Sequence, residues 1–226
     1  MEELTLTYRK ITLVGGLLIA LLSGCMGEKP QENLYVAFEN AAKQEKALFD
    51  DAKKLEDLET QGQELYTQII KEGKEHNEAV LQKIEQAIEN VDEREKVLKN
   101  EKDALGKAQK ETKSVQSYVD KIEDKKLQKQ AKKIEESYGN RYETFQKMNE
   151  SYTKSLTIEK DLYGKLKDKE TQLKEIGEKV KTVNTLNEEI QKEKEKFNQY
   201  TKEYNAEKLA FYKEAKIKIK EEKQGE

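Results

Sequence analysis

The fold class is decided by residues 183–211, which read VNTLNEEIQKEKEKFNQYTKEYNAEKLAF. Apolar side chains recur every seventh residue in this stretch, at Val183, Ile190, Phe197, Tyr204 and Phe211. A seven-residue apolar repeat among charged residues is typical of a long amphipathic helix that packs as helices do in coiled coils. Residues 172–222 are therefore predicted to form one long helix.

Three earlier segments, 31–72, 76–123 and 127–167, carry the same period. Each segment has a main seam, the row of residues spaced in sevens: Leu34, Ala41, Leu48, Leu55 and Ile69, then Ile84, Val91, Leu98, Leu105, Thr112 and Val119, then Leu127, Ile134, Met148 and Leu162. Short polar turns between long helices favour antiparallel neighbours within one chain. The sequence therefore predicts an all-α fold, an elongated antiparallel up-and-down bundle of about four long coiled-coil-like helices.

Several positions could end or interrupt these helices. Gly62 lies on the first seam, but the register continues to Ile69, so Gly73 is the better stop, and the choice between the two glycines stays open. Turns are predicted at 124–126 and 168–171, with Thr171 as a candidate N-cap. Beside each main seam runs a second row of residues spaced in sevens, the companion seam, and it includes polar side chains: Arg94, Glu101, Asn187, Lys194, Thr201 and Lys208. These polar residues argue against a simple dimeric zipper, although the oligomeric state stays open.

Composition supports this fold class and excludes others. Of the 226 residues, 39% are charged, yet 43 basic groups balance 46 acidic ones, so the net charge is only -3. A nucleic-acid-binding protein would show a large positive excess, so nucleic acid is not an expected partner. The chain has one proline, Pro30, and no tryptophan, which suits uninterrupted helices far better than strands.

The N-terminus has the form of a secretory signal. Arg9 and Lys10 precede a mostly apolar run at 11–22, which is too short for a bilayer core that takes about 20 residues to cross. Leu22-Ser23-Gly24-Cys25 then has the form of a lipobox, with cleavage expected between Gly24 and Cys25. Residues 1–24 are thus interpreted as a cleaved signal peptide, 25–30 as a lipidated cysteine with a tether, and 31–226 as the helical bundle domain. Glu2 and Glu3 leave the true start codon open.

Lipidation of Cys25 would give a stable anchor, because two acyl chains hold a protein on a membrane where one chain binds only reversibly. The tether is short and reaches at most ~20 Å at ~3.5 Å per residue. The alternative is a short uncleaved anchor with an incidental cysteine.

Residues typical of catalysis are scarce. Cys25 is the sole cysteine and His76, in a polar stretch, is the sole histidine, so neither a metal cluster nor a serine triad is expected. The glycines are scattered singly and form no phosphate-binding loop. Paired carboxylates such as Glu135-Glu136 are interpreted as solvated helix faces. The chain is predicted not to be an enzyme and to have no cofactor or metal.

Charge patterning suggests which end of the bundle faces a membrane. In an up-and-down bundle, the tether, the second turn and the C-terminus share one end. The second turn is basic, with Glu123 and Asp124 set against six lysines: Lys121, Lys125, Lys126, Lys129, Lys132 and Lys133. Residues 208–220 add five more lysines against Glu214. Contact with anionic headgroups or membrane-proximal teichoic acid is one interpretation, and clustering by chance or by helix-dipole preference is the other.

The chain resembles the YkyA family of cell-wall-binding lipoproteins of Gram-positive bacteria. The resemblance lies in ENLYVAFENAAKQEKALFDDAKKLE (32–56), ELYTQII (64–70), KIEDKKLQKQA (121–131) and FNQYTKEYNAEK (197–208). It implies a lipid-anchored helical bundle on the outer face of the cell membrane, facing the wall, and supplies no catalytic residues.

Two function hypotheses follow. In the first, the bundle binds or spaces wall polymer, with peptidoglycan or teichoic acid as candidate partners. In the second, it is a coiled-coil adaptor or regulator of another wall or membrane protein. A membrane-active helical protein is a third and weaker hypothesis, because no internal stretch is apolar enough to insert. The sequence does not identify the ligand.

Overall fold

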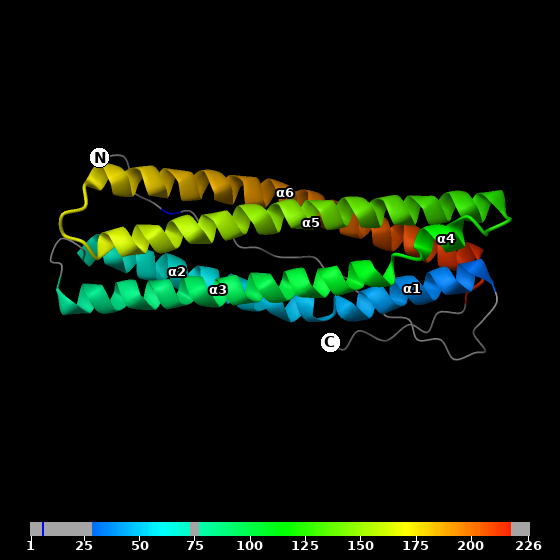
Figure 1. Cartoon of the computed structure of the whole chain (residues 1–226), viewed down its shortest axis with the longest axis horizontal. Helices are drawn as coiled ribbons and strands as arrows, with labels where there is room; N and C mark the ends of the chain where they lie inside the picture. Colours follow the sequence, from blue (N-terminus) through cyan, green and yellow to red (C-terminus); the bar gives the residue numbers. More distant parts are fainter. Residues whose placement is uncertain (1–5, 7–28, 73–76, 218–226) are drawn as a thin grey trace. The chain divides into compact units, whose positions relative to one another are not determined.

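The computed structural model describes Leu6, residues 29–72 and residues 77–217, and all regular secondary structure within them is α-helical. Figure 1 shows the elements in chain order: α1 (Pro30–Gln44), α2 (Ala47–Glu72), α3 (Glu78–Glu111), α4 (Val115–Val119), α5 (Lys125–Leu166) and α6 (Leu173–Glu214). The four long helices α2, α3, α5 and α6 have 26, 34, 42 and 42 residues. The predicted all-α class with four long helices is confirmed.

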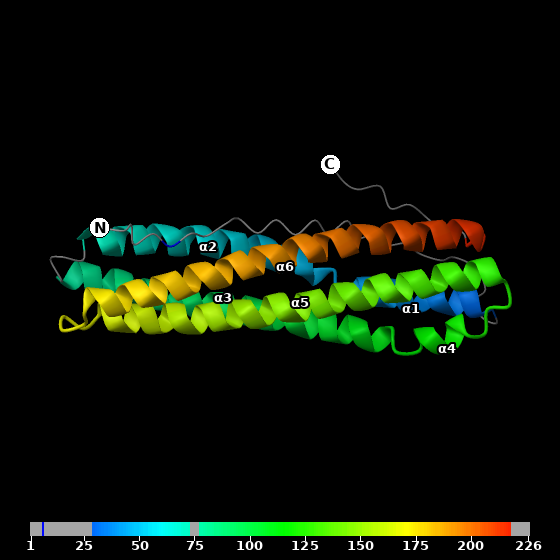
Figure 2. The same ribbon diagram turned by 90° about the horizontal axis from the view of Figure 1, so that it is seen from above.

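The helices build two compact units. Apart from Leu6, unit 1 comprises the described residues of 50–100 and 146–194, and unit 2 comprises 29–49, 101–145 and 195–217. The helices α2, α3, α5 and α6 each contribute residues to both units. Within unit 2, α1 and α4 lie beside the start of α5 and the end of α6 in both views (Figures 1 and 2).

Consecutive long helices run antiparallel within each unit. In unit 1, Lys54 pairs with Glu93 at 3.5 Å and Lys83 pairs with Glu72 at 2.5 Å, so numbers rise along α2 as they fall along α3. In unit 2, Ser137 bonds to Glu207 and Arg141 to Thr201, which gives the same relation between α5 and α6. The up-and-down connection of neighbouring helices is therefore as predicted.

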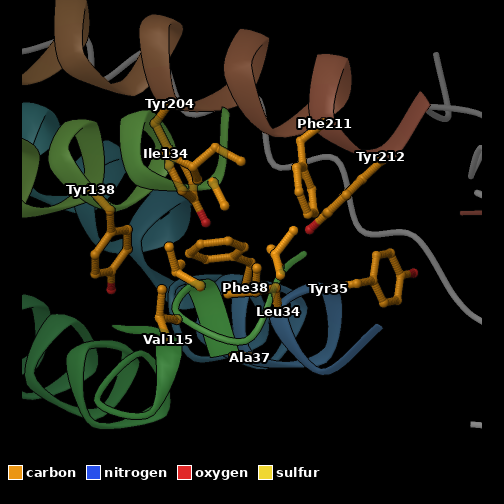
Figure 3. Close-up of a cluster of buried hydrophobic side chains, with 13 residues drawn as sticks. Leu34, Tyr35, Ala37, Phe38, Val115, Ile134, Tyr138, Tyr204, Phe211 and Tyr212 are labelled. Carbon is orange, nitrogen blue, oxygen red and sulfur yellow. The ribbon is translucent and has the colours of Figure 1, made fainter. Parts of the chain in front are cut away.

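The core of unit 2 is rich in aromatic rings (Figure 3). Phe38 of α1 meets Tyr204 of α6 edge-on with ring centroids 5.9 Å apart, and Tyr35 meets Tyr212 at 4.8 Å. All four side chains are at most 5% exposed. Aromatic pairs in such offset or edge-on geometry stabilise a core beyond the area they bury, so this cluster holds α1 against the end of α6.

Local sequence signals explain most helix starts. Pro30 opens α1, where its missing N–H costs no hydrogen bond. Asn77 Oδ1 accepts the Val80 N–H at 3.1 Å before α3. Asp124 Oδ1 accepts the N–H groups of Lys126 and Leu127 at 2.8 and 3.1 Å and so caps α5.

The predicted first helix over 31–72 is wrong as a single element, because it breaks at Glu45 and Lys46 between α1 and α2. The seam hid the break, since Ala41 and Leu48 on either side of it are both buried. Gly62 lies inside α2, as the continuing register indicated. The alternative stop at Gly73, and His76 beyond it, lie outside the described residues.

The predicted second helix over 76–123 is also divided. It ends at Glu111 and resumes only as the short α4. The hydroxyl of Thr112 donates to the Gln109 carbonyl at 2.9 Å, and that of Ser117 donates to the Ser114 carbonyl at 2.7 Å. Such hydroxyls compete for backbone groups and favour a helix interruption, and α4 then packs against α1.

The third helix is close to prediction, whereas the fourth differs at both ends. Since α6 begins at Leu173, Gln172 and not Thr171 precedes its first residue. The helix ends at Glu214 rather than 222, and residues beyond 217 lie outside the described part. Lys216 has φ 54° and the Ile217 N–H bonds to the Tyr212 carbonyl at 2.9 Å, which is the left-handed termination that ends many helices.

We predict that Gly62→Ala destabilises the protein by about 1 kcal/mol, because overpacking a tight contact costs roughly that much or more. A Cβ at position 62 would lie 3.0 Å from Asn90 Oδ1. Asn90 cannot easily retreat, since its Nδ2 donates to the Leu58 carbonyl at 2.9 Å and its Oδ1 accepts from Arg94 at 3.0 Å. Denaturant unfolding followed by circular dichroism measures the change.

Gly164→Ala in the same unit is the matched control, because a Cβ at that helical position meets nothing within 4 Å. It should stabilise the protein by about 0.5–1 kcal/mol through helix propensity. Equal stabilisation by both substitutions would contradict the close approach of α2 and α3 at Gly62.

Candidate functional site

The six lysines predicted as an anionic-surface contact are all exposed in unit 2: Lys121, Lys125, Lys126, Lys129, Lys132 and Lys133. They lie in the turn between α4 and α5 and along the first turns of α5. Asp124 of the same turn is occupied in capping α5. The turn therefore presents lysine side chains to solvent.

The end of α6 lies against this turn. Lys126 Nζ is 2.8 Å from Glu214 Oε1, so the first turn of α5 and the last residue of α6 are in contact. The Tyr35–Tyr212 contact holds the start of α1 beside that same end of α6. Three chain segments far apart in sequence thus meet at one end of unit 2, as the two views show (Figures 1 and 2).

We define the basic end by its exposed lysines: Lys29, Lys121, Lys125, Lys126, Lys129, Lys132, Lys133, Lys213 and Lys216. Six carboxylates lie in or beside the same short segments: Glu32, Asp120, Glu123, Asp124, Glu135 and Glu214. The basic end therefore carries an excess of three positive charges. Exposed ion pairs such as Lys126–Glu214 contribute little stability, so these side chains are free to respond to an external anion.

One lysine counted toward the basic C-terminal segment does not belong to that surface. Lys208 is only 1% exposed and its Nζ lies 3.0 Å from Glu39 Oε1, with the Tyr212 hydroxyl also donating to Glu39 at 2.9 Å. Including Lys208 was wrong, because its position on the seven-residue seam faces the core. Lys218 and Lys220, together with Gly24 and Cys25, lie outside the described residues.

A second buried ion pair in unit 2 joins Arg141 to Glu45 at 2.7 Å. Arg141 also donates to Thr201 Oγ1 at 2.9 Å and lies over the Phe197 ring, 4.6 Å from its centroid. Tyr138 donates to the same carboxylate at 3.4 Å, and burial together with the Glu45 charge raises the pKa of that tyrosine. The residue at the α1–α2 break is thus held inside the unit.

Unit 1 contains a comparable buried cluster. Arg94 Nη2 lies 2.5 Å from Glu159 Oε1, and both side chains are 1% exposed. The Tyr152 hydroxyl donates to Glu59, whose other oxygen, Oε2, has no hydrogen-bond partner among the described residues. Burial raises the pKa of Glu59 to about 7, although Tyr152, Arg94 and Lys194 each lower it. Glu59 therefore titrates near neutral pH and is protonated below it.

Sequence reasoning misses these clusters as sites, because polar residues at companion seam positions are there taken only as evidence against a simple dimeric zipper. The available signal was their spacing: Arg94 lies seven residues from Glu101, and Lys194, Thr201 and Lys208 follow one another in sevens. All five are buried. A charged residue in phase with a buried seam predicts a buried partner, but the sequence does not say which carboxylate it is.

We predict that the wild-type protein loses up to about 3 kcal/mol of stability relative to Glu59→Gln as the pH rises from about 4.5 to 7. The sign follows from the raised pKa of Glu59 in the folded state. The folded protein keeps the proton that the unfolded chain releases over this range, so deprotonation penalises folding. Glutamine keeps an oxygen that can accept from Tyr152 and removes the titration.

Denaturant unfolding of both proteins at about pH 4.5, 5.5, 6.5 and 7.5 measures this difference, over a range that reaches the Glu59 pKa of about 7. At each pH the free energy of unfolding of the variant is subtracted from that of the wild type, so that the contributions of other carboxylates cancel. Glu64→Gln, at an exposed position of the same helix, is the control and should give a flat difference. A flat difference for Glu59→Gln would show that this carboxyl is not buried in solution.

In the described ranges, no group of three or more His, Cys, Asp or Glu is placed to hold a metal ion. Among the helices described, none is long and apolar enough to cross a membrane.

Comparison with known proteins connects this geometry to a family. A family model described as "YkyA: Putative cell-wall binding lipoprotein" matches residues 29–214. The chain is 31% identical over 150 residues to the protein named "Uncharacterized lipoprotein YkyA" of Bacillus subtilis (strain 168), covering 66% of this chain and 67% of that protein. No solved structure matches the chain.

Proposed function

Because the chain belongs to the YkyA family of lipoproteins, we propose that it is anchored through lipidated Cys25 to the outer face of the cell membrane. There its helical bundle binds or spaces cell-wall material without catalysing a reaction. Residues 1–24 act as the cleaved signal peptide, with the cut between Gly24 and Cys25, and residues 25–30 are the tether. The helical domain occupies 31–226.

The observation that carries this proposal is the position of Pro30. It begins α1 in the segment that forms part of the basic end, and it follows Cys25 by five residues. A tether of that length spans at most ~20 Å. The anchor thus holds one defined end of unit 2 near the bilayer and leaves the charged helix faces as the surface offered to the wall.

The buried charges support a non-catalytic role. Arg94 with Glu159, Arg141 with Glu45 and Lys208 with Glu39 are each paired inside a unit, where they hold helices together instead of facing a substrate. Surface contact with a polymer needs only the exposed rows of charged side chains.

We predict that Cys25→Ala abolishes lipid labelling and releases the protein from membranes or leaves it as an unprocessed precursor, because the thiol is the acceptor of the acylated glycerol. Membrane fractionation with incorporation of labelled palmitate measures the effect. Glu28→Gln, a change in the tether outside the lipobox, should leave labelling and fractionation unchanged. A mature, lipid-labelled Cys25→Ala protein in the membrane fraction would refute the anchor.

We further predict that the mature protein cosediments with purified peptidoglycan, or with peptidoglycan carrying teichoic acid, and that excess soluble wall fragments release it. Bovine serum albumin at the same concentration is the negative control for trapping in the pellet. Absence of cosedimentation would contradict a direct wall-binding role.

The alternative function is an adaptor or regulator that contacts another wall or membrane protein through a helix face. Leu173 favours it, since this large apolar side chain at the start of α6 is 79% exposed. Crosslinking in intact cells would then give one discrete protein adduct, reduced by Leu173→Glu, while cosedimentation with bare wall would be absent.

A further inference from the structure

We propose that the basic end of unit 2 is a docking surface for anionic phospholipid headgroups, so that the protein is held on the membrane by two signals, its lipid anchor and this surface. The inference rests on the proposed function, because it takes Cys25 as the anchor. It adds a defined set of contacts and an orientation of unit 2 on the bilayer.

The first argument is convergence. Lys29 precedes α1, Lys125 and Lys126 open α5, and Lys213 and Lys216 lie at the end of α6. The Tyr35–Tyr212 contact and the Lys126–Glu214 ion pair bring these segments to one end. The resulting surface is contributed by three separate segments of the fold and does not belong to a single lysine-rich helix.

The second argument is rigidity beneath the surface. The core cluster of unit 2 reaches this end through Leu34, Ile122, Ala131 and Phe211, all at most 4% exposed. The turns that carry the lysines are therefore held in place by packed helices beneath them. A surface held in this way loses less conformational freedom on binding than a lysine-rich loop would.

The third argument is the distance from the anchor. A tether of at most ~20 Å keeps the basic end close to the headgroups, so binding is an intramolecular event at high effective concentration. Electrostatic attraction fades over a Debye length of about 8 Å at physiological salt. Binding in this mode should therefore be weak without the anchor and strongly dependent on salt.

Anionic lipid is favoured over a wall polymer for this surface because of where the anchor holds it. The acyl chains fix the start of α1 at the bilayer, so headgroup phosphates are the anions always within reach. A soluble poly(glycerol phosphate) carries the same phosphate chemistry and serves as the competing arm of the test.

The test uses the mature lipidated protein with one added thiol. Because Cys25 is the chain's sole cysteine and is blocked by lipid in the proposed mature form, Ser117→Cys at an exposed position of α4 can be labelled selectively. Energy transfer from a donor at position 117 to an acceptor on lipid headgroups reports how near the basic end lies to the bilayer. Vesicles of phosphatidylcholine alone are compared with vesicles containing about one-third phosphatidylglycerol, at about 0.05 M and about 0.5 M salt.

The parent protein should show higher transfer on anionic than on neutral vesicles at low salt, and equal transfer on both at high salt. Replacing Lys125, Lys126, Lys129, Lys132 and Lys133 by Gln should remove the difference at low salt. The matched control replaces five exposed lysines of unit 1 by Gln, with the same change in net charge, and should behave as the parent: Lys53, Lys147, Lys154, Lys174 and Lys181.

The proposal would be overturned if the parent showed equal transfer on both kinds of vesicle at low salt. It would also be overturned if the unit 1 control variant lost the difference between anionic and neutral vesicles as fully as the five-lysine variant does. Soluble poly(glycerol phosphate) that shifts the signal on neutral vesicles, without any effect of anionic lipid, would assign the surface to a polymer and also overturn it. If the five-lysine variant fails to fold, the dependence of energy transfer on salt and lipid composition in the parent protein still tests the proposal. Failure of the anchor is distinguishable, because the protein would then not partition into neutral vesicles at all.

Discussion

Burial of charged side chains in helix seams is the constraint on which each unit depends. An isolated charge in a core is costly, and removing one partner of a buried pair typically costs about 3–5 kcal/mol. Arg94 with Glu159 in unit 1, and Arg141 with Glu45 and Lys208 with Glu39 in unit 2, satisfy that constraint only at one alignment of their helices. A helix displaced by one turn would leave charges unpaired. Apolar seams tolerate such sliding better, because one leucine can replace another as a neighbour.

The same constraint explains features that apolar packing alone would not require. Glu45 directly follows α1 and yet stays buried, since its carboxylate meets Arg141 and Tyr138 inside unit 2. Gly62 has no side chain where Asn90 and Arg94 approach α2. Polar residues at seam positions are known to specify register in coiled coils, at some expense in stability. Here the Lys208–Glu39 pair aligns α1 and α6 so that Tyr35, near the start of α1, meets Tyr212, near the end of α6.

That alignment connects the interior of unit 2 to its surface. Lys208 and Lys213 lie five residues apart on α6, but the first pairs with Glu39 in the core and the second faces solvent. Lysine is thus used in two distinct ways within one helix. Buried lysines hold the helices in register, and exposed lysines at the basic end remain available for an anionic surface.

The sequence by itself determined the fold class and much of the surface. Seven-residue apolar repeats without proline are compatible with little except long helices, and the seam residues Val183, Ile190 and Phe211 are buried as the period predicts. The exposed lysines of the α4–α5 turn were predictable too, since short turns connect neighbouring helices. Periodicity is a local property, and it carries these conclusions without knowledge of any partner.

Tertiary structure alone decided where the helices break and which charges pair. The seven-residue spacing continues through both breaks with Ala41, Leu48 and Val119 still buried, so the spacing alone does not predict a break at Glu45–Lys46. At residues 112–114 the seam carries only the polar Thr112 as a sign of the break. Many carboxylates share the same seven-residue period. The pairing of Arg94 with Glu159, or of Lys208 with Glu39, therefore depends on the axial position at which the second helix packs against the first. A repeat in the sequence specifies which face of a helix is buried, whereas only contact between helices specifies which residue lies opposite.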